Sequence, residues 1–177
     1  MSVTITKNTD QHGGHFTGGY VMRAECVLPQ DVEQVFPFFA DAYQLEAITP
    51  PYLNFRVLTP RPIDMHAGQL IDYQLRLHRI PIGWKTKISA WEPNERFIDE
   101  AIKSPYKFWH HEHLFEPCAD GTRVIEIVHY GVPGGALIHA LLVRREVQKI
   151  FEYREQVLKS IFKPQTQAEK VAKLAAT

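Results

Sequence analysis

Residues 122–161, TRVIEIVHYGVPGGALIHALLVRREVQKIFEYREQVLKSI, contain the change of pattern that decides the fold. Up to Tyr130 the apolar residues alternate with a period of two, which is typical of a strand with one buried face. From about Ala136 the period becomes 3.6, as in an amphipathic helix. The apolar stripe of this helix is formed by Leu137, Leu141, Val143, Val147, Ile150, Phe151, Val157, Leu158 and Ile161. We expect a helix of about 26 residues, or about 39 Å, that ends before Pro164.

The two-residue period recurs upstream in short stretches that turn-forming residues separate. The expected strands are residues 20–28, 53–59, 69–78, 82–92, 96–101, 106–116 and 122–130. Residues 29–41 and 42–48 have helical spacing instead, and Pro37 is expected to kink or shorten the first of these two helices. Short connections between consecutive strands favour antiparallel neighbours. The sequence therefore predicts an α+β fold: a seven-stranded antiparallel sheet wrapped around a long C-terminal helix, with two short helices after the first strand.

Composition excludes several classes of function. The chain has 177 residues, and its 20 basic and 20 acidic side chains give a formal net charge of zero. We therefore expect no nucleic-acid partner. The two cysteines, Cys26 and Cys118, form no CxxC pair, and we expect them to be reduced. The sequence has neither a signal-peptide pattern nor an apolar run of about 20 residues, so we expect a cytoplasmic protein without a membrane span.

The chain is expected to have three parts. Residues 1–19 are polar and rich in Gly, His and Thr. They are interpreted as a flexible N-terminal arm, in which VTIT at residues 3–6 is compatible with a short strand. Residues 20–163 are expected to form a single domain, and residues 164–177 a polar C-terminal tail.

The stretch 107–116, KFWHHEHLFE, is the most informative one for function. Strand geometry places Trp109, His111, His113 and Phe115 on one face, and the aromatic residues at both ends indicate that this face points inward. The Asp-Gly pair at residues 120–121 predicts a hairpin that sets Phe115 opposite Val124. In that register, His111 and His113 lie on the same face of the sheet as the residues opposite them in the strand at 122–130.

The same register places His113 opposite Glu126, and Trp109 opposite Tyr130. The preceding strand adds Asp99 to this interior. We therefore predict an inward-facing set of imidazole, carboxyl and aromatic groups that contact a ligand. Its members are Tyr73, Trp84, Phe97, Asp99, Trp109, His111, His113, Glu126 and Tyr130.

Three interpretations of the polar part of this set compete. In the first, the histidines and carboxylates only satisfy one another's hydrogen bonds inside the domain. In the second, they bind the polar end of a mostly apolar ligand. In the third, His111 or His113 is the general base of a cyclisation or dehydration. The first is the most common arrangement in proteins, and the third is the least common.

Other chemistries have weaker signals. His111, His113 and Glu126 could hold a metal ion, because His-x-His on a strand directs two nitrogens to one side. The register is inferred, however, and no outer layer of ligands can be recognised, so we expect no metal and no cofactor. The motifs GxSxG and GxGxxG and a Walker loop are absent. Basic residues expected on the solvated face of the last helix are Arg144, Arg145 and Arg154.

Several stretches resemble one family. They are VFPFFADAYQLEAITPPYLNFRVLTP (35–60), GQLIDYQLRL (68–77), WKTKISAWEPNERFIDE (84–100), SPYKFWHHEHLFEP (104–117) and FEYR (151–154). The order of elements resembles the START-like helix-grip superfamily (SRPBCC), which includes lipid-transfer domains, pollen-allergen-type plant proteins, polyketide cyclases and oxygenase catalytic domains. The local motifs resemble a bacterial subgroup of small ligand-binding proteins within this superfamily. The resemblance covers residues 20–162. It implies that residues 20–163 form a ligand-binding domain with a cavity between sheet and helix, and that Tyr52 and Leu53 lie near its mouth.

The residues and the resemblance together favour binding of a small, mostly apolar molecule, such as a lipid, a quinone or a polyketide-like compound. One alternative is an enzyme of the polyketide cyclase or dehydratase type, lyase-like, with His113 or His111 as base. The other is an interaction protein that makes no use of the cavity. The expected partner is the small ligand, and a weak homodimer stays open.

Overall fold

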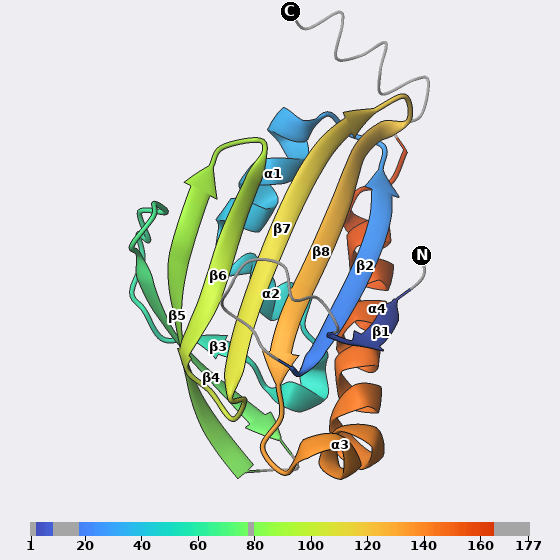
Figure 1. Cartoon of the computed structure of the whole chain (residues 1–177). Coiled ribbons are helices and arrows are strands. Elements are labelled where there is room, and N and C mark those ends of the chain that lie inside the picture. Colours follow the sequence, from blue (N-terminus) through green and yellow to red (C-terminus); the bar gives the residue numbers. More distant parts are fainter. Residues whose placement is uncertain (1–2, 9–17, 78–79, 165–177) are drawn as a thin grey trace, which may run out of the picture.

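The sheet is larger than predicted. The computed structural model describes residues 3–8, 18–77 and 80–164, so the rest of the expected arm and tail lies outside the described residues. Eight strands, all antiparallel to their neighbours, follow the order β1-β2-β8-β7-β6-β5-β4-β3 (Figure 1). They are β1 (Thr4–Lys7), β2 (Tyr20–Leu28), β3 (Arg56–Val57), β4 (Leu70–Leu77), β5 (Ile80–Glu92), β6 (Arg96–Lys103), β7 (Phe108–Cys118) and β8 (Gly121–Gly131).

The prediction of seven strands was wrong because of β1. This segment, which includes most of VTIT, pairs with the edge of β2. The edge of a sheet offers unpaired backbone groups, and β-branched residues such as Thr4 and Thr6 suit an added strand. By contrast, β3 is shorter than predicted. Leu53 belongs to a 3₁₀ turn, and Asn54 has a left-handed backbone (φ 43°), so neither residue extends the strand.

The hairpin between β7 and β8 forms as predicted, and its turn depends on a glycine. Gly121 has φ of 123°, and a Cβ atom there would meet the backbone oxygen of Leu28. Only glycine tolerates both conditions. The hairpin therefore sets the register of the two strands that carry the candidate site.

The helices lie on the concave side of the sheet (Figure 1). They are α1 (Val32–Ala40), which runs through Pro37, α2 (Gln44–Ala47) and a continuous C-terminal run. That run consists of α3 (Gly135–Ile138), a π-helical segment (His139–Val143) and α4 (Arg144–Ile161), and it confirms the predicted long helix.

The apolar stripe of the C-terminal run is buried only in α4. Val147, Phe151 and Leu158 are each at most 2% exposed, whereas Leu137 and Leu141 are 68% and 63% exposed. The first turns of the run lie beyond the ends of β2 and β8 (Figure 1), which leaves this part of the stripe exposed. Among the described residues, no helix is long and apolar enough to cross a membrane.

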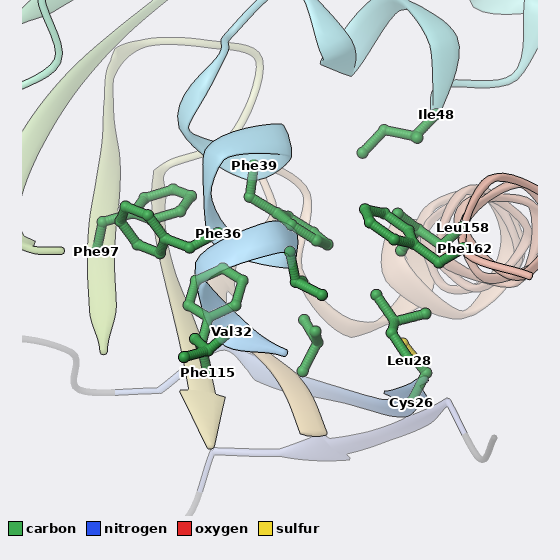
Figure 2. Close-up of a cluster of buried hydrophobic side chains, with 12 residues drawn as sticks. Cys26, Leu28, Val32, Phe36, Phe39, Ile48, Phe97, Phe115, Leu158 and Phe162 are labelled. Carbon is green, nitrogen blue, oxygen red and sulfur yellow. The ribbon is translucent and has the colours of Figure 1, made fainter. Parts of the chain in front are cut away.

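Three apolar clusters pack between the sheet and the helices. The largest joins α1 to the sheet and to the end of the C-terminal helix, and Figure 2 shows Phe36 and Phe39 of α1 facing the strands and Leu158. The second packs Met22 and Tyr130 against Val147 and Phe151 of α4. The third lies around Ile71 and Ile88 of β4 and β5. The candidate site lies where these clusters meet.

Candidate functional site

The predicted register of the site is confirmed. His113 pairs with Glu126 and Trp109 with Tyr130 across β7 and β8. On the other side of β7, Asp99 of β6 lies opposite His111. Both histidines point inward, since His111 and His113 are only 5% and 3% exposed. Three adjacent strands thus bring two imidazoles and two carboxylates into one buried cluster.

The two imidazole rings lie between the two carboxylates. Their centroids are 3.7 Å apart and their planes are tilted by 34°. On one edge, Asp99 Oδ2 is 3.0 Å from His113 Nε2 and 3.4 Å from His111 Nδ1. On the opposite edge, Glu126 Oε1 is 3.4 Å from His111 Nε2 and 3.7 Å from His113 Nδ1. Phe97 stacks on the outer face of His113, with centroids 4.1 Å apart.

Arg154 is the member of the cluster that sequence reasoning missed. It was expected on the solvated face of the last helix, but it is 7% exposed and its Nη1 donates to Glu126 Oε1. The signal was present in the sequence: Arg154 lies seven residues after Val147 and four before Leu158, which is the spacing of the buried stripe. A charged residue at such a position needs a buried partner, and Glu126 is that partner.

The electrostatics keep both carboxyl groups ionised. Burial alone would raise the pKa of Glu126, but the Arg154 guanidinium and the two histidines lower it well below its usual range. The pKa of Asp99 is lowered in the same way, against the effect of burial, by His111 and by the hydrogen bond with His113. Burial and the neighbouring His111 lower the pKa of His113 to about 4. At neutral pH the His113 ring is therefore neutral.

This arrangement predicts loss of stability in mild acid. Because the pKa of His113 falls from 6.5 in the unfolded chain to about 4, the unfolded state binds more protons between these values. The contribution of His113 to the free energy of unfolding is fully present above pH 6.5 and is lost as the pH falls towards 4. We expect a loss of roughly 3 kcal/mol in the free energy of unfolding, measured by urea titration with EDTA present.

A matched pair of variants separates His113 from the other titrating groups. His113→Gln keeps a donor for Asp99 but cannot titrate, so its stability should change much less over this range. His66→Gln, at an exposed position, should behave like the wild type. An equally steep loss in His113→Gln would assign the effect to other groups.

The cluster lies at the wall of a cavity between the sheet and the helices. The cavity has a volume of about 160 Å³, and most of its wall is apolar or aromatic. Its polar side chains include Asp99, His111, His113, Arg154 and Glu146. Of the residues predicted to contact a ligand, those that line it are Tyr73, Trp84, Phe97, Asp99, Trp109, His111 and His113.

Two predicted residues lie behind the cavity wall. Glu126 does not line the cavity but lies behind the histidines, where it receives Arg154. Tyr130 is 0% exposed, and its hydroxyl forms a 2.9 Å hydrogen bond with His139 Nε2. Glu126 and Tyr130 thus lie close to the cavity without lining it. The ligand-binding role of all nine residues stays a prediction.

Tyr52 and Leu53, which the resemblance placed near the mouth of the cavity, differ in whether they line it. Leu53 lines the cavity, whereas Tyr52 is 57% exposed and does not line it. The Tyr52 hydroxyl donates to Glu146 Oε1 at 2.6 Å, which links the turn before β3 to the first turn of α4. The bond therefore holds the 3₁₀ turn next to a residue that lines the cavity.

A second hollow, of about 430 Å³, lies between α1 and the loop before β4. It is lined by residues such as Pro37, Tyr43 and Arg61, whose guanidinium lies 3.9 Å from the Tyr43 ring centroid. None of the buried titratable residues of the cluster lines it. It therefore offers less specific chemistry than the cavity beside the histidines.

Comparisons with known proteins identify the fold. No family model matches the chain, and no curated protein matches its sequence. Protein CV1439 from Chromobacterium violaceum aligns at a TM-score of 0.66 and 14% identity, over 82% of this chain and 99% of that one. Ara h 8.0201 aligns at a TM-score of 0.57 and 15% identity, over 79% and 97%.

A third structure comes from a biosynthetic pathway. The di-domain ARO/CYC protein StfQ, from the steffimycin pathway, aligns at a TM-score of 0.64 and 11% identity. The match covers 80% of this chain and 50% of StfQ. Identities this low carry information about architecture alone. The chain therefore has the START-like helix-grip fold: an antiparallel sheet wrapped around a long C-terminal helix.

Proposed function

We propose that the protein binds a small, mostly apolar molecule in the cavity beside the histidine cluster. The observation that carries this proposal is the combination of an apolar, aromatic wall with one polar corner formed by Asp99, His111 and His113. Ligand sites commonly have this anatomy, with apolar burial providing affinity and a few polar groups providing orientation. Similarity of fold to Ara h 8.0201 and StfQ is compatible with such a role.

The volume of the cavity limits the size of the ligand. A cavity of about 150 Å³ in another protein accommodates one benzene ring. The volume of about 160 Å³ therefore favours a molecule about one ring in size. A long-chain lipid or a fused-ring polyketide would require the cavity to widen.

The polar corner favours a ligand that donates a hydrogen bond. Asp99 is ionised, and its side chain is 19% exposed, whereas the carboxylate of Glu126 is turned to Arg154. A phenolic or alcoholic hydroxyl could therefore donate to Asp99, and bonds to a charged acceptor are the stronger ones. A small phenol is the simplest molecule that satisfies both the wall and the corner.

The two alternatives are less well supported. A cyclase-type enzyme would use His113 or His111 as base, but a pKa of about 4 makes His113 a weak base at neutral pH. An interaction protein would explain the exposed Leu137 and Leu141. It would leave the buried charged cluster and the cavity beside it without a role.

The three tryptophans allow a direct test. Trp84 and Trp109 line the cavity and Trp91 does not, so Trp91 serves as an internal control. In ¹⁵N-labelled protein with EDTA, para-cresol should shift the indole N–H signals of Trp84 and Trp109 saturably. The Trp91 signal should move far less.

Toluene, which lacks the hydroxyl, tests the polar corner. We expect it to bind about ten-fold more weakly than para-cresol, because Asp99 then loses its donor. Single Trp→Phe variants assign the three signals. Equal small shifts of all three signals, without saturation, would contradict the proposal. Native mass spectrometry of protein purified from its own cells would then identify a natural ligand by its mass.

A further inference from the structure

We propose that Asp99, His111 and His113 form a binding site for a divalent transition-metal ion at the polar corner of the cavity. From the sequence we expected no metal, and the candidate third ligand beside the two histidines was Glu126. The geometry points to Asp99 instead. This inference goes beyond ligand binding, which requires no metal.

The first argument is the spacing of the donor atoms. One atom from each of the three residues lies within 4.8 Å of the others. Asp99 Oδ2 is 3.0 Å from His113 Nε2 and 3.4 Å from His111 Nδ1. With bonds of about 2.1 Å, two ligands of one metal ion lie about 3.0 to 3.4 Å apart at octahedral and tetrahedral angles. Small rotations of the two imidazole rings would direct both nitrogens to one ion.

The second argument is the outer edge of the histidine pair. His111 Nε2 and His113 Nδ1 are buried without a hydrogen-bond partner, and both face Glu126 Oε1. Metal-binding histidines commonly donate their second ring N–H to a carboxylate. If both rings donate to Glu126, these atoms gain a partner, and the lone pairs of the other two nitrogens face Asp99.

The third argument is charge. Apart from the histidines, the buried cluster holds the two carboxylates of Asp99 and Glu126 and only one guanidinium, that of Arg154, so its carboxylates outnumber its permanent cation. A divalent cation beside Asp99 would offset this difference. Because Arg154 already pairs with Glu126, the cation site lies on the Asp99 side.

The chemistry of the donor set indicates the class of ion. Two imidazoles and one carboxylate suit Zn²⁺, Fe²⁺ and Co²⁺ better than Ca²⁺ or Mg²⁺, which prefer oxygen ligands. All three residues line the cavity, so the remaining coordination positions face the space proposed for the organic ligand. Three protein ligands and an open position distinguish such a site from a closed structural one.

Titration with Co²⁺ tests the site directly. The full chain is stripped with EDTA, dialysed free of chelator and titrated with Co²⁺, and binding is followed by visible absorption and equilibrium dialysis. We expect one bound equivalent per chain and a rise in melting temperature, since the ion binds only the folded state. Asp99→Asn, of the same shape, should weaken binding at least 100-fold.

The controls separate this site from other histidines. His110 is adjacent to His111 in β7, but its Nδ1 contacts Glu100. The His110→Ala variant should therefore retain full Co²⁺ binding. His12→Ala/His15→Ala removes the two histidines near the N-terminus and should also retain it. Circular dichroism checks that Asp99→Asn folds. The proposal is overturned if wild-type protein binds less than about one fifth of an equivalent, or if folded Asp99→Asn binds as tightly as wild type. Cresol binding is measured with EDTA, so either proposal can fail alone.

Discussion

Replacing Arg154 with methionine is expected to lower the free energy of unfolding by about 3–5 kcal/mol. Arg154 and Glu126 are 7% and 2% exposed, and the guanidinium donates directly to the carboxylate. Methionine fills much of the same space but leaves a buried carboxylate without its cation. Removal of one partner of a buried ion pair is among the most destabilising single substitutions. Urea denaturation at neutral pH, with EDTA present, measures the effect.

A second substitution should reverse most of this loss. Glu126→Gln removes the uncompensated charge, so the Glu126→Gln/Arg154→Met protein should recover more than half of the stability lost by Arg154→Met. The Arg154→Met deficit should also shrink in mild acid, because the unpaired charge of Glu126 would then raise the proton affinity of His113. If the double variant is less stable than Arg154→Met, the contribution of Arg154 is packing on Phe151, 4.7 Å from its guanidinium, and not charge.

Local sequence signals predict the half of the site that one hairpin carries. The Asp-Gly turn and the alternation of β7 and β8 are short-range features, so the pairing of His113 with Glu126 followed from them. Asp99 was also correctly placed, because β6 is the adjacent strand in the chain as well as in the sheet. Each of these predictions requires only that neighbouring strands pair as hairpins.

The rest depends on long-range packing that no local pattern encodes. Arg154 is 28 residues from Glu126, and its contact requires the angle at which α4 crosses the sheet. The exposure of Leu137 likewise depends on where the sheet ends beneath the helix, which the period of 3.6 does not specify. Strand alternation likewise gives the face on which Tyr130 lies, but not that its hydroxyl forms a hydrogen bond with His139 of the C-terminal run.

The helix-grip architecture explains why the charged cluster and the cavity are adjacent. A curved sheet and a single helix pack closely along one line, here where α4 lies against β1 and β2 (Figure 1). Away from that line the surfaces diverge, and the side chains of α2, β4 and β5 close the remaining space only in part. The ion pair of Arg154 and Glu126 lies at the edge of the cavity. Arg154 and the two histidines of β7 line that edge.

The largest functional effect is expected from filling the cavity. Leu45 of α2 is partly buried and lines the cavity, and its replacement by tryptophan would place an indole in the space proposed for the ligand ring. We expect Leu45→Trp to lower the affinity for para-cresol at least 100-fold. The added volume should destabilise the protein by no more than about 1–3 kcal/mol, because it enters a void and not a filled core.

Leu70→Trp is the matched control, because Leu70 is 45% exposed at the start of β4 and does not line the cavity. It adds the same indole to the sheet and should bind para-cresol like the wild type. The indole N–H signals of Trp84 and Trp109 report binding in both variants, and circular dichroism reports folding. Unchanged affinity in a folded Leu45→Trp protein would place the ligand outside this cavity. The hollow lined by Tyr43 and Arg61 would then be the next position to test.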